Sequence, residues 1–264
     1  MIHWFNEDFI GSPVMWALLA CLVIQLLAWW WQKVTQNADI VDIAWTLGII
    51  VSAIIYMSMI TSWFSHKILI VLFPVLWYSR LIWHLLRRYE VEHEDSRYQN
   101  LRAHWSANTQ VKFLMFFMFQ ALLSLVFSLP AFWVLSVNTI YFWQICVAVI
   151  IGLSALVGVT IADHQLLTFK KENPANKVCN VGLWRYSRHP NYFFEWVHWL
   201  VYPILLLNSD LFWNAVAVTL MMLLFLMKLT GIPFSEQQAI KKRGDAYKKY
   251  MKQTSQFIPW DFKK

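Results

Sequence analysis

The chain has 264 residues and a net charge of +7, and 59% of its residues are hydrophobic, 17% aromatic and only 14% charged. A soluble domain has about a quarter charged residues, so this composition excludes an ordinary soluble protein and favours an integral membrane protein. The basic excess does not require a nucleic-acid partner, because membrane topology and contact with anionic lipids explain it. The three cysteines lack metal-ligand spacing, so neither a disulfide nor a metal site is expected.

Seven apolar runs are long enough to cross a bilayer as helices, which takes about 20 residues. We expect an all-α fold: a polytopic membrane protein with a seven-transmembrane-helix bundle and cytoplasmic loops, forming a single domain over residues 1–264. The expected spans are Pro13–Trp31, Ile40–Ile60, Lys67–Leu86, Phe113–Ser136, Ile140–Leu166, Asn191–Leu207 and Leu211–Leu229.

The distribution of basic residues orients this bundle. All Lys and Arg residues except Lys67 and Arg80 follow the first, third or fifth span or belong to the C-terminal part of the chain. Because positive charge marks the cytoplasmic side, we expect the amino terminus outside and the carboxyl terminus in the cytoplasm. The segment Met1–Ser12 has no Lys or Arg and so lacks the basic region of a signal peptide, and the first span is expected to be retained.

Charged residues interrupt the second and third spans. Asp39 alone could be a helix cap, whereas Asp42 lies one turn deeper in an apolar run. A buried carboxyl of this kind can stay protonated and donate a hydrogen bond to a developing oxyanion. In the third span, Arg80 and His84 lie one turn apart and close to Tyr78. We expect Arg80 to face the interior or a carboxylate, and a purely structural ion pair is the alternative.

Asp163 and Lys170 lie at the cytoplasmic end of the fifth span and share one helix face. They could form an ordinary pair of snorkelling side chains at the membrane interface. Alternatively, the carboxylate could accept a hydrogen bond from a ribose hydroxyl or a carboxamide.

The most informative segment is Gly182–Trp196, in which a basic stretch runs directly into an apolar helix. Arg185, Arg188 and His189 come just before Pro190, and proline is favoured at the first position of a helix. The exposed amides of a helix start, its positive dipole end and two arginines predict an anion site of phosphate size.

Within that helix, four polar residues are spaced to share one face: Asn191, Glu195, His198 and Tyr202. Ionisable residues inside a membrane helix are functional by default, although a glutamate that only holds helices together is the alternative. None of the seven glycines forms a G-x-G-x-x-G or P-loop motif, so the bundle itself would have to hold any nucleotide. The pattern favours a site for a large anionic cofactor.

After the last span, Gly231-Ile232-Pro233 is expected to end the helix. Ser235 can then cap a short amphipathic C-terminal helix, rich in Lys and Arg, that runs to about Met251. The aromatic segment Phe257–Trp260 could dock at the interface or against the bundle.

These residues together resemble a known family. The segment Gly-Leu-Trp-Arg-Tyr-Ser-Arg-His-Pro-Asn-Tyr-x-x-Glu-Trp is similar to the signature of the steroid 5α-reductase superfamily, and most of all to its bacterial branch, the type called domain of unknown function 1295. The resemblance covers most of the chain from the second span onward, with the signature region at residues 160–260. Its other motifs are Asp42-x-x-Trp45, Glu94-Asp95-x-Arg97-Tyr98, Asp163-x-Gln165 and Gly231-Ile232-Pro233 through Pro259-Trp260.

The resemblance implies an NADPH-dependent reductase of the 3-oxo-5α-steroid 4-dehydrogenase type in the bacterial inner membrane. Such enzymes transfer a hydride to the β-carbon of an enone in a hydrophobic, steroid- or lipid-like substrate from the bilayer, and no obligate protein partner is expected. By their position in the chain, and not by alignment with the Glu/Tyr pair of the animal steroid enzymes, Asp42 and Tyr78 are candidates to polarise the carbonyl, and Glu195 is a third catalytic candidate. The residues expected to bind the cofactor are Arg80, Arg97, Tyr98, Asp163, Lys170, Arg185, Arg188, His189, Asn191 and Glu195.

Two departures from the family pattern concern specificity. The glycine that usually precedes the glutamate of the motif is Phe194 here, which is expected to crowd that helix face. A His-rich segment of the animal enzymes is replaced by Ser235-Glu236-Gln237-Gln238, which puts steroid specificity in doubt.

Two other function classes remain open. Isoprenylcysteine and phospholipid methyltransferases share the Arg-His-Pro motif and a basic C-terminal helix, but they bind S-adenosylmethionine and often have a Glu-Glu pair where this chain has only Glu236. A non-catalytic lipid-binding or transport protein is the third hypothesis, although transporters usually show repeats or broken helices at the midplane.

Overall fold

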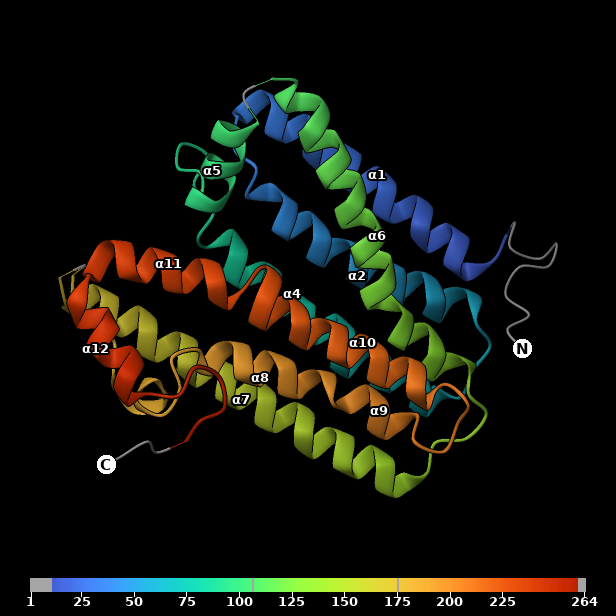
Figure 1. Cartoon of the computed structure of the whole chain (residues 1–264). Coiled ribbons are helices and arrows are strands. Elements are labelled where there is room, and N and C mark those ends of the chain that lie inside the picture. The colour runs from blue at the N-terminus through green and yellow to red at the C-terminus, as the bar shows by residue number, and fades with distance from the viewer. Residues whose placement is uncertain (1–10, 106, 175, 261–264) are drawn as a thin grey trace. The chain divides into compact units, whose positions relative to one another are not determined.

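The computed structural model describes residues 11–105, 107–174 and 176–260 (Figure 1). These residues form helices joined by loops, without any strand, so the all-α expectation is confirmed for them. The chain forms two compact units, Met1–Thr139 and Ile140–Lys264. The expectation for the amino-terminal segment concerns mainly residues 1–10, which lie outside the described part.

Within the described ranges, six helices are long and apolar enough to cross a membrane, so the protein is an integral membrane protein. Four are continuous: α1 (Pro13–Thr35), α2 (Ile40–Met59), α6 (Thr109–Ser136) and α7 (Phe142–Glu172). The other two are composite. One joins α3 (Phe64–Ile70) to α4 (Leu76–Leu86) through the π-helical turn η2 (Val71–Val75), and the other begins with α10 (Phe212–Leu224).

The sixth expected span, Asn191–Leu207, is not one continuous helix. It is divided between α8 (Pro190–Trp199) and α9 (Val201–Leu205), with a turn at Leu200. Each piece is too short to count by itself as a candidate span. Pro190 occupies the first turn of α8, as the sequence predicts.

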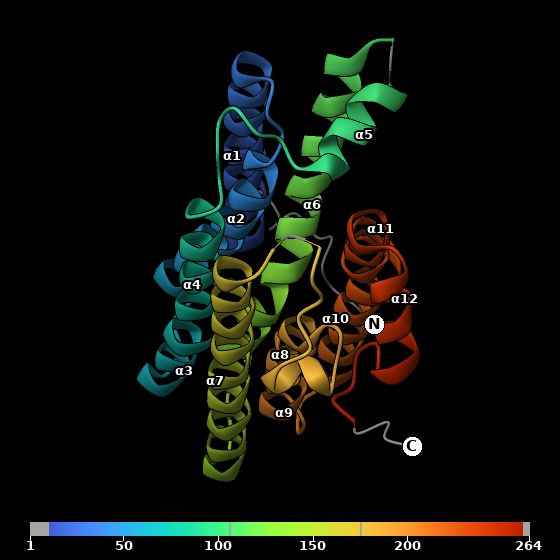
Figure 2. The same ribbon diagram turned by 90° about the vertical axis from the view of Figure 1, so that its left-hand side faces the viewer.

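In the first unit, α1, α2 and α6 pack side by side (Figures 1 and 2). Small residues allow this close approach: a Cβ atom on Gly48 of α2 would lie only 3.0 Å from the Cβ of Ser124 on α6. The short helix α5 (Ser96–His104) lies at the end of this unit where α1 ends and α6 begins (Figure 2). It joins a core of Ala28, Ala38, Val41, Ala44, Tyr98, Phe113 and Phe117.

In the second unit, α8 packs against α7 and α10 and lies between them in Figure 2. The 3₁₀ turn η3 (Gly182–Arg185) leads into α8. Most of the buried residues of α7 are small, which lets α8 come close to it. These residues are Ala148, Gly152, Ala155, Gly158 and Ala162.

The C-terminal part differs from the single helix expected from Ser235 to Met251. After the π-helical turn η4 (Phe225–Leu229) the chain forms α11 (Ile232–Arg243) and α12 (Asp245–Gln253). Ser235 does not cap a helix start, because α11 begins three residues earlier and the Ser235 hydroxyl donates to the Gly231 carbonyl at 2.7 Å. Gly244 separates the two helices at φ +53°, a conformation that favours glycine.

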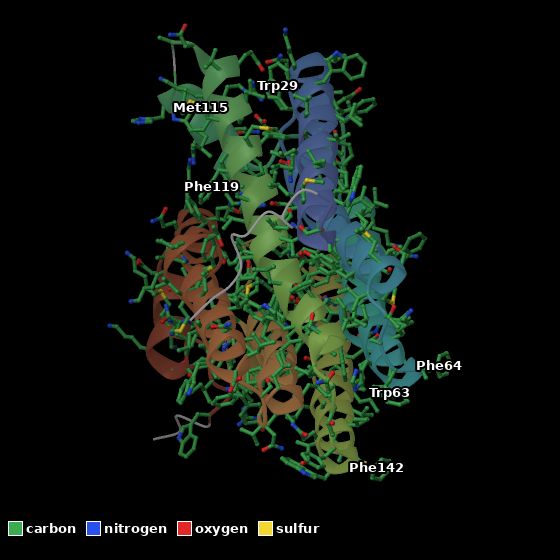
Figure 3. All side chains as sticks on the ribbon, turned by 90° about the vertical axis from the view of Figure 1, so that its right-hand side faces the viewer. Trp29, Trp63, Phe64, Met115, Phe119 and Phe142 are labelled. Atoms are coloured by element: carbon green, nitrogen blue, oxygen red, sulfur yellow. The ribbon has the colours of Figure 1, made fainter. Side chains whose placement is uncertain are left out.

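Large apolar side chains project outward from the helices, as expected of surfaces in contact with lipid. Figure 3 shows Met115 and Phe119 on α6, and both are exposed. Trp63 and Phe64, at the start of α3, are also exposed and point away from the first unit (Figure 3). Phe142, at the start of α7 in the second unit, is exposed as well and projects outward from the end of that helix (Figure 3).

Candidate functional site

The first unit brings together three of the predicted site residues, which come from two elements, α2 and α5. Asp42, in the first turn of α2, accepts a hydrogen bond from the Arg97 guanidinium at 3.0 Å and one from the Tyr98 hydroxyl at 2.9 Å. The Arg97 and Asp42 side chains are 31% and 32% exposed, so this ion pair is open to solvent on one side. In this arrangement the Asp42 carboxylate is an acceptor, and the donors around it come from α5.

A second contact attaches the segment before α5 to the start of α2. Asp39 is the N-cap residue of α2, but its side chain makes no capping hydrogen bond. Its carboxylate oxygens instead accept from the backbone N–H of Asp95 at 2.9 and 3.1 Å. Burial, together with the nearby carboxylates of Asp95 and Asp42, raises the pKa of Asp39 to about 6. Asp39 is therefore an anchor for this segment.

Glu94 and Arg102 complete this cluster. The Glu94 carboxylate accepts from Arg102 at 2.8 Å and from the backbone N–H of Ala38 at 2.8 Å. Arg102 also donates to the Gln36 backbone carbonyl at 3.1 Å, at the end of α1. The charged loop between the third and fourth spans is thus a folded element bound to α1 and to the start of α2.

Tyr78 and Arg80 lie on α4. Tyr78 is fully buried, and its ring meets the Trp45 ring edge-on at a centroid distance of 5.9 Å. The Arg80 guanidinium lies over the Trp77 ring at 5.1 Å. Trp45 and Tyr78 therefore join α2 to α4 within the first unit.

In the second unit, Arg188 and His189 converge on Glu236 of α11. The Arg188 Nε donates to Glu236 Oε1 at 2.7 Å, and the same oxygen lies 3.4 Å from His189 Nε2. The three side chains are only 8%, 6% and 11% exposed for Arg188, His189 and Glu236. Burial lowers the pKa of His189, and Glu236 opposes this effect.

Arg188 also binds the C-terminal segment. Its Nη1 donates to the backbone carbonyls of Met251 at 2.9 Å and Thr254 at 2.7 Å. Its backbone N–H donates to the Ser255 carbonyl at 2.8 Å, and the Ser187 hydroxyl donates to the Phe257 carbonyl at 2.7 Å. Through these bonds, Arg188 and Ser187 join the signature segment to the C-terminal segment.

Arg185 differs from Arg188 although the two are three residues apart. Its side chain is exposed, 6.0 Å from the Tyr186 ring. Of the two arginines expected to clamp an anion, Arg185 is thus the accessible one, while the donors of Arg188 serve the fold.

The helix α8 begins directly after His189, and one of its faces is polar. Asn191, Glu195 and His198 share one side of this helix by their spacing. The side-chain carbonyl of Asn191 is buried without a hydrogen-bond partner among the described residues. Tyr202 lies beyond the turn at Leu200, but its ring still meets the His198 ring at 5.9 Å. A buried acceptor such as the Asn191 carbonyl costs free energy unless a ligand or water satisfies it.

On α7, the family motif Asp163-x-Gln165 lies beside the turn before α8. The Gln165 carbonyl oxygen accepts from the backbone N–H of Leu183 at 2.9 Å. Gly182 adopts φ +55°, a conformation that favours glycine, and a Cβ there would also crowd the Gln165 amide. The Trp184 indole donates to the Ala162 carbonyl at 2.9 Å. Asp163 is partly buried on this helix, whereas Lys170, two turns further on, is exposed.

Sequence reasoning missed several partners in these clusters. In the sequence, Glu236 only stands where the methyltransferases often have a Glu-Glu pair. Nothing in the pattern indicates that Arg188 and His189 converge on it. Arg102 carried no signal beyond its charge. Glu94 is part of a family motif but lies before the start of α5, eight residues from Arg102, so no i, i+4 spacing indicated this ion pair.

Comparison with known proteins identifies the family to which this chain belongs. The profile of the family described as protein of unknown function (DUF1295) matches residues 28–254. The chain has no significant match among curated proteins or among solved structures. Because the match covers most of the chain, this protein belongs to the DUF1295 family, which is steroid 5α-reductase-like.

Proposed function

We propose that the protein is a membrane-embedded, NADPH-dependent reductase that adds hydride to an activated C=C bond of a hydrophobic enone, such as a steroid- or lipid-like substrate. The observation that supports this proposal most is the buried Asn191 carbonyl, which lacks a partner among the described residues on a helix face that also carries Glu195 and His198. An acceptor next to a carboxylate fits the amide donors of a nicotinamide carboxamide.

The residues present fit such a cofactor in chemical type. Arg185 is an exposed cation just before the start of α8, where backbone amides and the helix dipole favour phosphate. Arg188 supports the site indirectly by holding the signature segment in place. NADPH supplies the hydride when bound, and the protein contributes binding, orientation and polarisation of the substrate carbonyl. Tyr78, whose hydroxyl can donate a hydrogen bond, remains our candidate for that polarisation, whereas both oxygens of Asp42 already accept from Arg97 and Tyr98.

We also propose that α8 and α9 together form a seventh crossing, with the amino terminus outside and the carboxyl terminus in the cytoplasm of the bacterial inner membrane. With this crossing, the basic segments after α1, after α4, after α7 and after α10 all fall on one side. Without it, the many lysines of α11 and α12 would lie opposite the other basic segments, against the positive-inside rule.

The test is a calorimetric titration of the purified protein in lipid nanodiscs with NADPH, NADH and S-adenosylmethionine. We expect NADPH to bind at least about tenfold more tightly than NADH, because a cation can pair with the 2′-phosphate. Tight S-adenosylmethionine binding without an NADPH response would instead support a methyltransferase. Binding of none of the three, with lipid binding retained, would support a non-catalytic lipid-binding protein.

The Glu195→Ala variant tests the polar face directly. We expect it to lose at least about tenfold in NADPH affinity, because a hydrogen bond to a charged group contributes about 1.5–3 kcal/mol. Asp210→Ala is the matched control, since Asp210 is an exposed carboxylate of the same unit at the far end of α9, and it should bind like the unaltered protein. Unchanged NADPH affinity in a folded Glu195→Ala variant would remove Glu195 from the site.

A further inference from the structure

Phe194 is the residue of the signature helix that departs from the family pattern, and the structure shows where its ring goes. The ring lies directly on Gly158 of α7. A Cβ atom added at Gly158 would come within 2.4 Å of Cδ1 and of Cε1 and within 2.5 Å of Cζ of Phe194. Real Cβ atoms do not approach other atoms this closely, so no residue other than glycine fits at position 158 while the ring stays in place.

Phe194 shares a face of α8 with two of the polar residues, because it lies three positions after Asn191 and four before His198. Glu195 is its direct neighbour in the sequence and points about 100° away around the helix axis. Any rotation of α8 that moved the Phe194 ring off Gly158 would therefore also redirect these polar side chains.

Aromatic contacts hold α8 from another direction as well. Phe193 meets Phe257 of the C-terminal segment at 5.7 Å between ring centroids, and Trp196 meets the same ring at 6.1 Å. Phe193 and Phe194 also meet each other edge-on at 5.3 Å. Rings on two sides of one short helix, each against a different element, leave little freedom for it to turn about its axis.

We propose that Phe194 and Gly158 form a positioning pair that sets the rotation of α8 and so aims Asn191 and Glu195 at the ligand. Gly158 is the determining partner, because its missing side chain creates the space that the ring fills. The part of this inference that concerns NADPH rests on the proposed function, whereas the part that concerns the rotation of α8 does not.

The experiment is a double-mutant cycle with Gly158→Ala, Phe194→Ala and the double variant. Deuterium exchange of the peptide 190–199 reports on α8 without any ligand. Gly158→Ala should raise this exchange about tenfold, because the ring must leave its place, and adding Phe194→Ala should bring it back towards the original rate. The matched control combines Gly158→Ala with Phe193→Ala, the neighbouring phenylalanine that packs on Phe257, and here no restoration is expected.

NADPH affinity is the second readout, measured below the unfolding temperature of every variant. A positioning role predicts that Gly158→Ala weakens NADPH binding about tenfold in the folded protein and that the double variant regains part of it, whereas a purely structural contact would lower only the unfolding midpoint. Additive effects in the exchange cycle, or unchanged NADPH affinity in folded Gly158→Ala, would overturn the inference. If the unaltered protein does not bind NADPH, the proposed function fails, and the exchange cycle still decides whether the pair sets α8.

Discussion

Each unit of the protein contains a cluster of charged side chains with an arginine that the sequence predicts to bind the cofactor. The two clusters differ in how far their side chains are exposed to solvent. Around Asp42 the Arg97 side chain is 31% exposed, and its partners are carboxylates. Around Glu236 the Arg188 side chain is 8% exposed, and its remaining bonds go to backbone carbonyls of the C-terminal segment.

Arg97 and Arg188 are both expected from the sequence to bind the cofactor, but this difference in exposure assigns them different roles. A partly exposed ion pair contributes little to stability and can exchange its partner for a ligand. A buried guanidinium that satisfies a carboxylate and two carbonyls cannot be removed without leaving those groups unpaired. We therefore expect the cluster around Asp42 to affect ligand binding more than folding, and the cluster around Glu236 to affect folding more than ligand binding.

The largest expected effect is that of Arg188→Ala. It leaves Glu236 buried without its cation and frees the carbonyls of Met251 and Thr254, so we expect a loss of about 3–5 kcal/mol in stability. Thermal unfolding in nanodiscs measures the loss, and limited proteolysis should show early cleavage of the C-terminal segment. Arg185→Ala is the matched control, with an expected change within about 0.5 kcal/mol because that side chain is exposed. Equal effects of the two substitutions would remove the contrast.

A smaller effect on stability is expected from Arg97→Ala, which breaks the partly exposed pair with Asp42. The loss should be about 1 kcal/mol, since solvent screens the pair. If the cluster is open to a ligand, the same variant should weaken NADPH binding several-fold. Arg87→Ala controls for charge, because Arg87 is an exposed arginine of the same unit that lies over the Trp83 ring at 4.7 Å. A large loss of stability with unchanged NADPH affinity would show that this cluster, too, is structural.

The pH dependence of the Asp39 anchor sharpens the comparison further. Its pKa is raised from 3.8 to about 6, so the folded state favours the protonated form. The resulting stability is fully present below pH 3.8 and is lost as the pH rises through 6. Because Asp39 is only partly buried, we expect a change of about 1 kcal/mol after allowing for screening.

The measurement for Asp39 is the difference in unfolding midpoint between the unaltered protein and Asp39→Asn from pH 4 to 7. The amide does not titrate, so the difference isolates this carboxyl from other groups, including the neighbouring Asp95, Asp42 and Arg97. A difference that is independent of pH would show that Asp39 does not titrate in this range.

Several features of the fold could be predicted from local sequence alone. The apolar runs that became α1, α2, α6 and α7 needed no tertiary information, because lipid forces a chain to satisfy its backbone hydrogen bonds within each helix. Pro190 marked the start of α8 for a similarly local reason. The break at Leu200 and the early start of α11 were not predicted, although each lies close to a proline that is a local signal. Pro203 lacks the N–H that would bond to the Trp199 carbonyl, and Pro233 lies in the first turn of α11.

The sequence by itself therefore determined the class of the protein, its membrane helices and the residues worth examining. Only the tertiary structure decided what those residues do. Arg97 lies 55 positions from Asp42, and Arg188 lies 48 positions from Glu236, so no local pattern specifies either pair. The sequence pattern predicts that Phe194 crowds its helix face. In the structure its ring fits, because Gly158 on another helix provides the space. Charge and volume are properties of single residues, whereas burial and complementarity exist only between elements that the fold brings together.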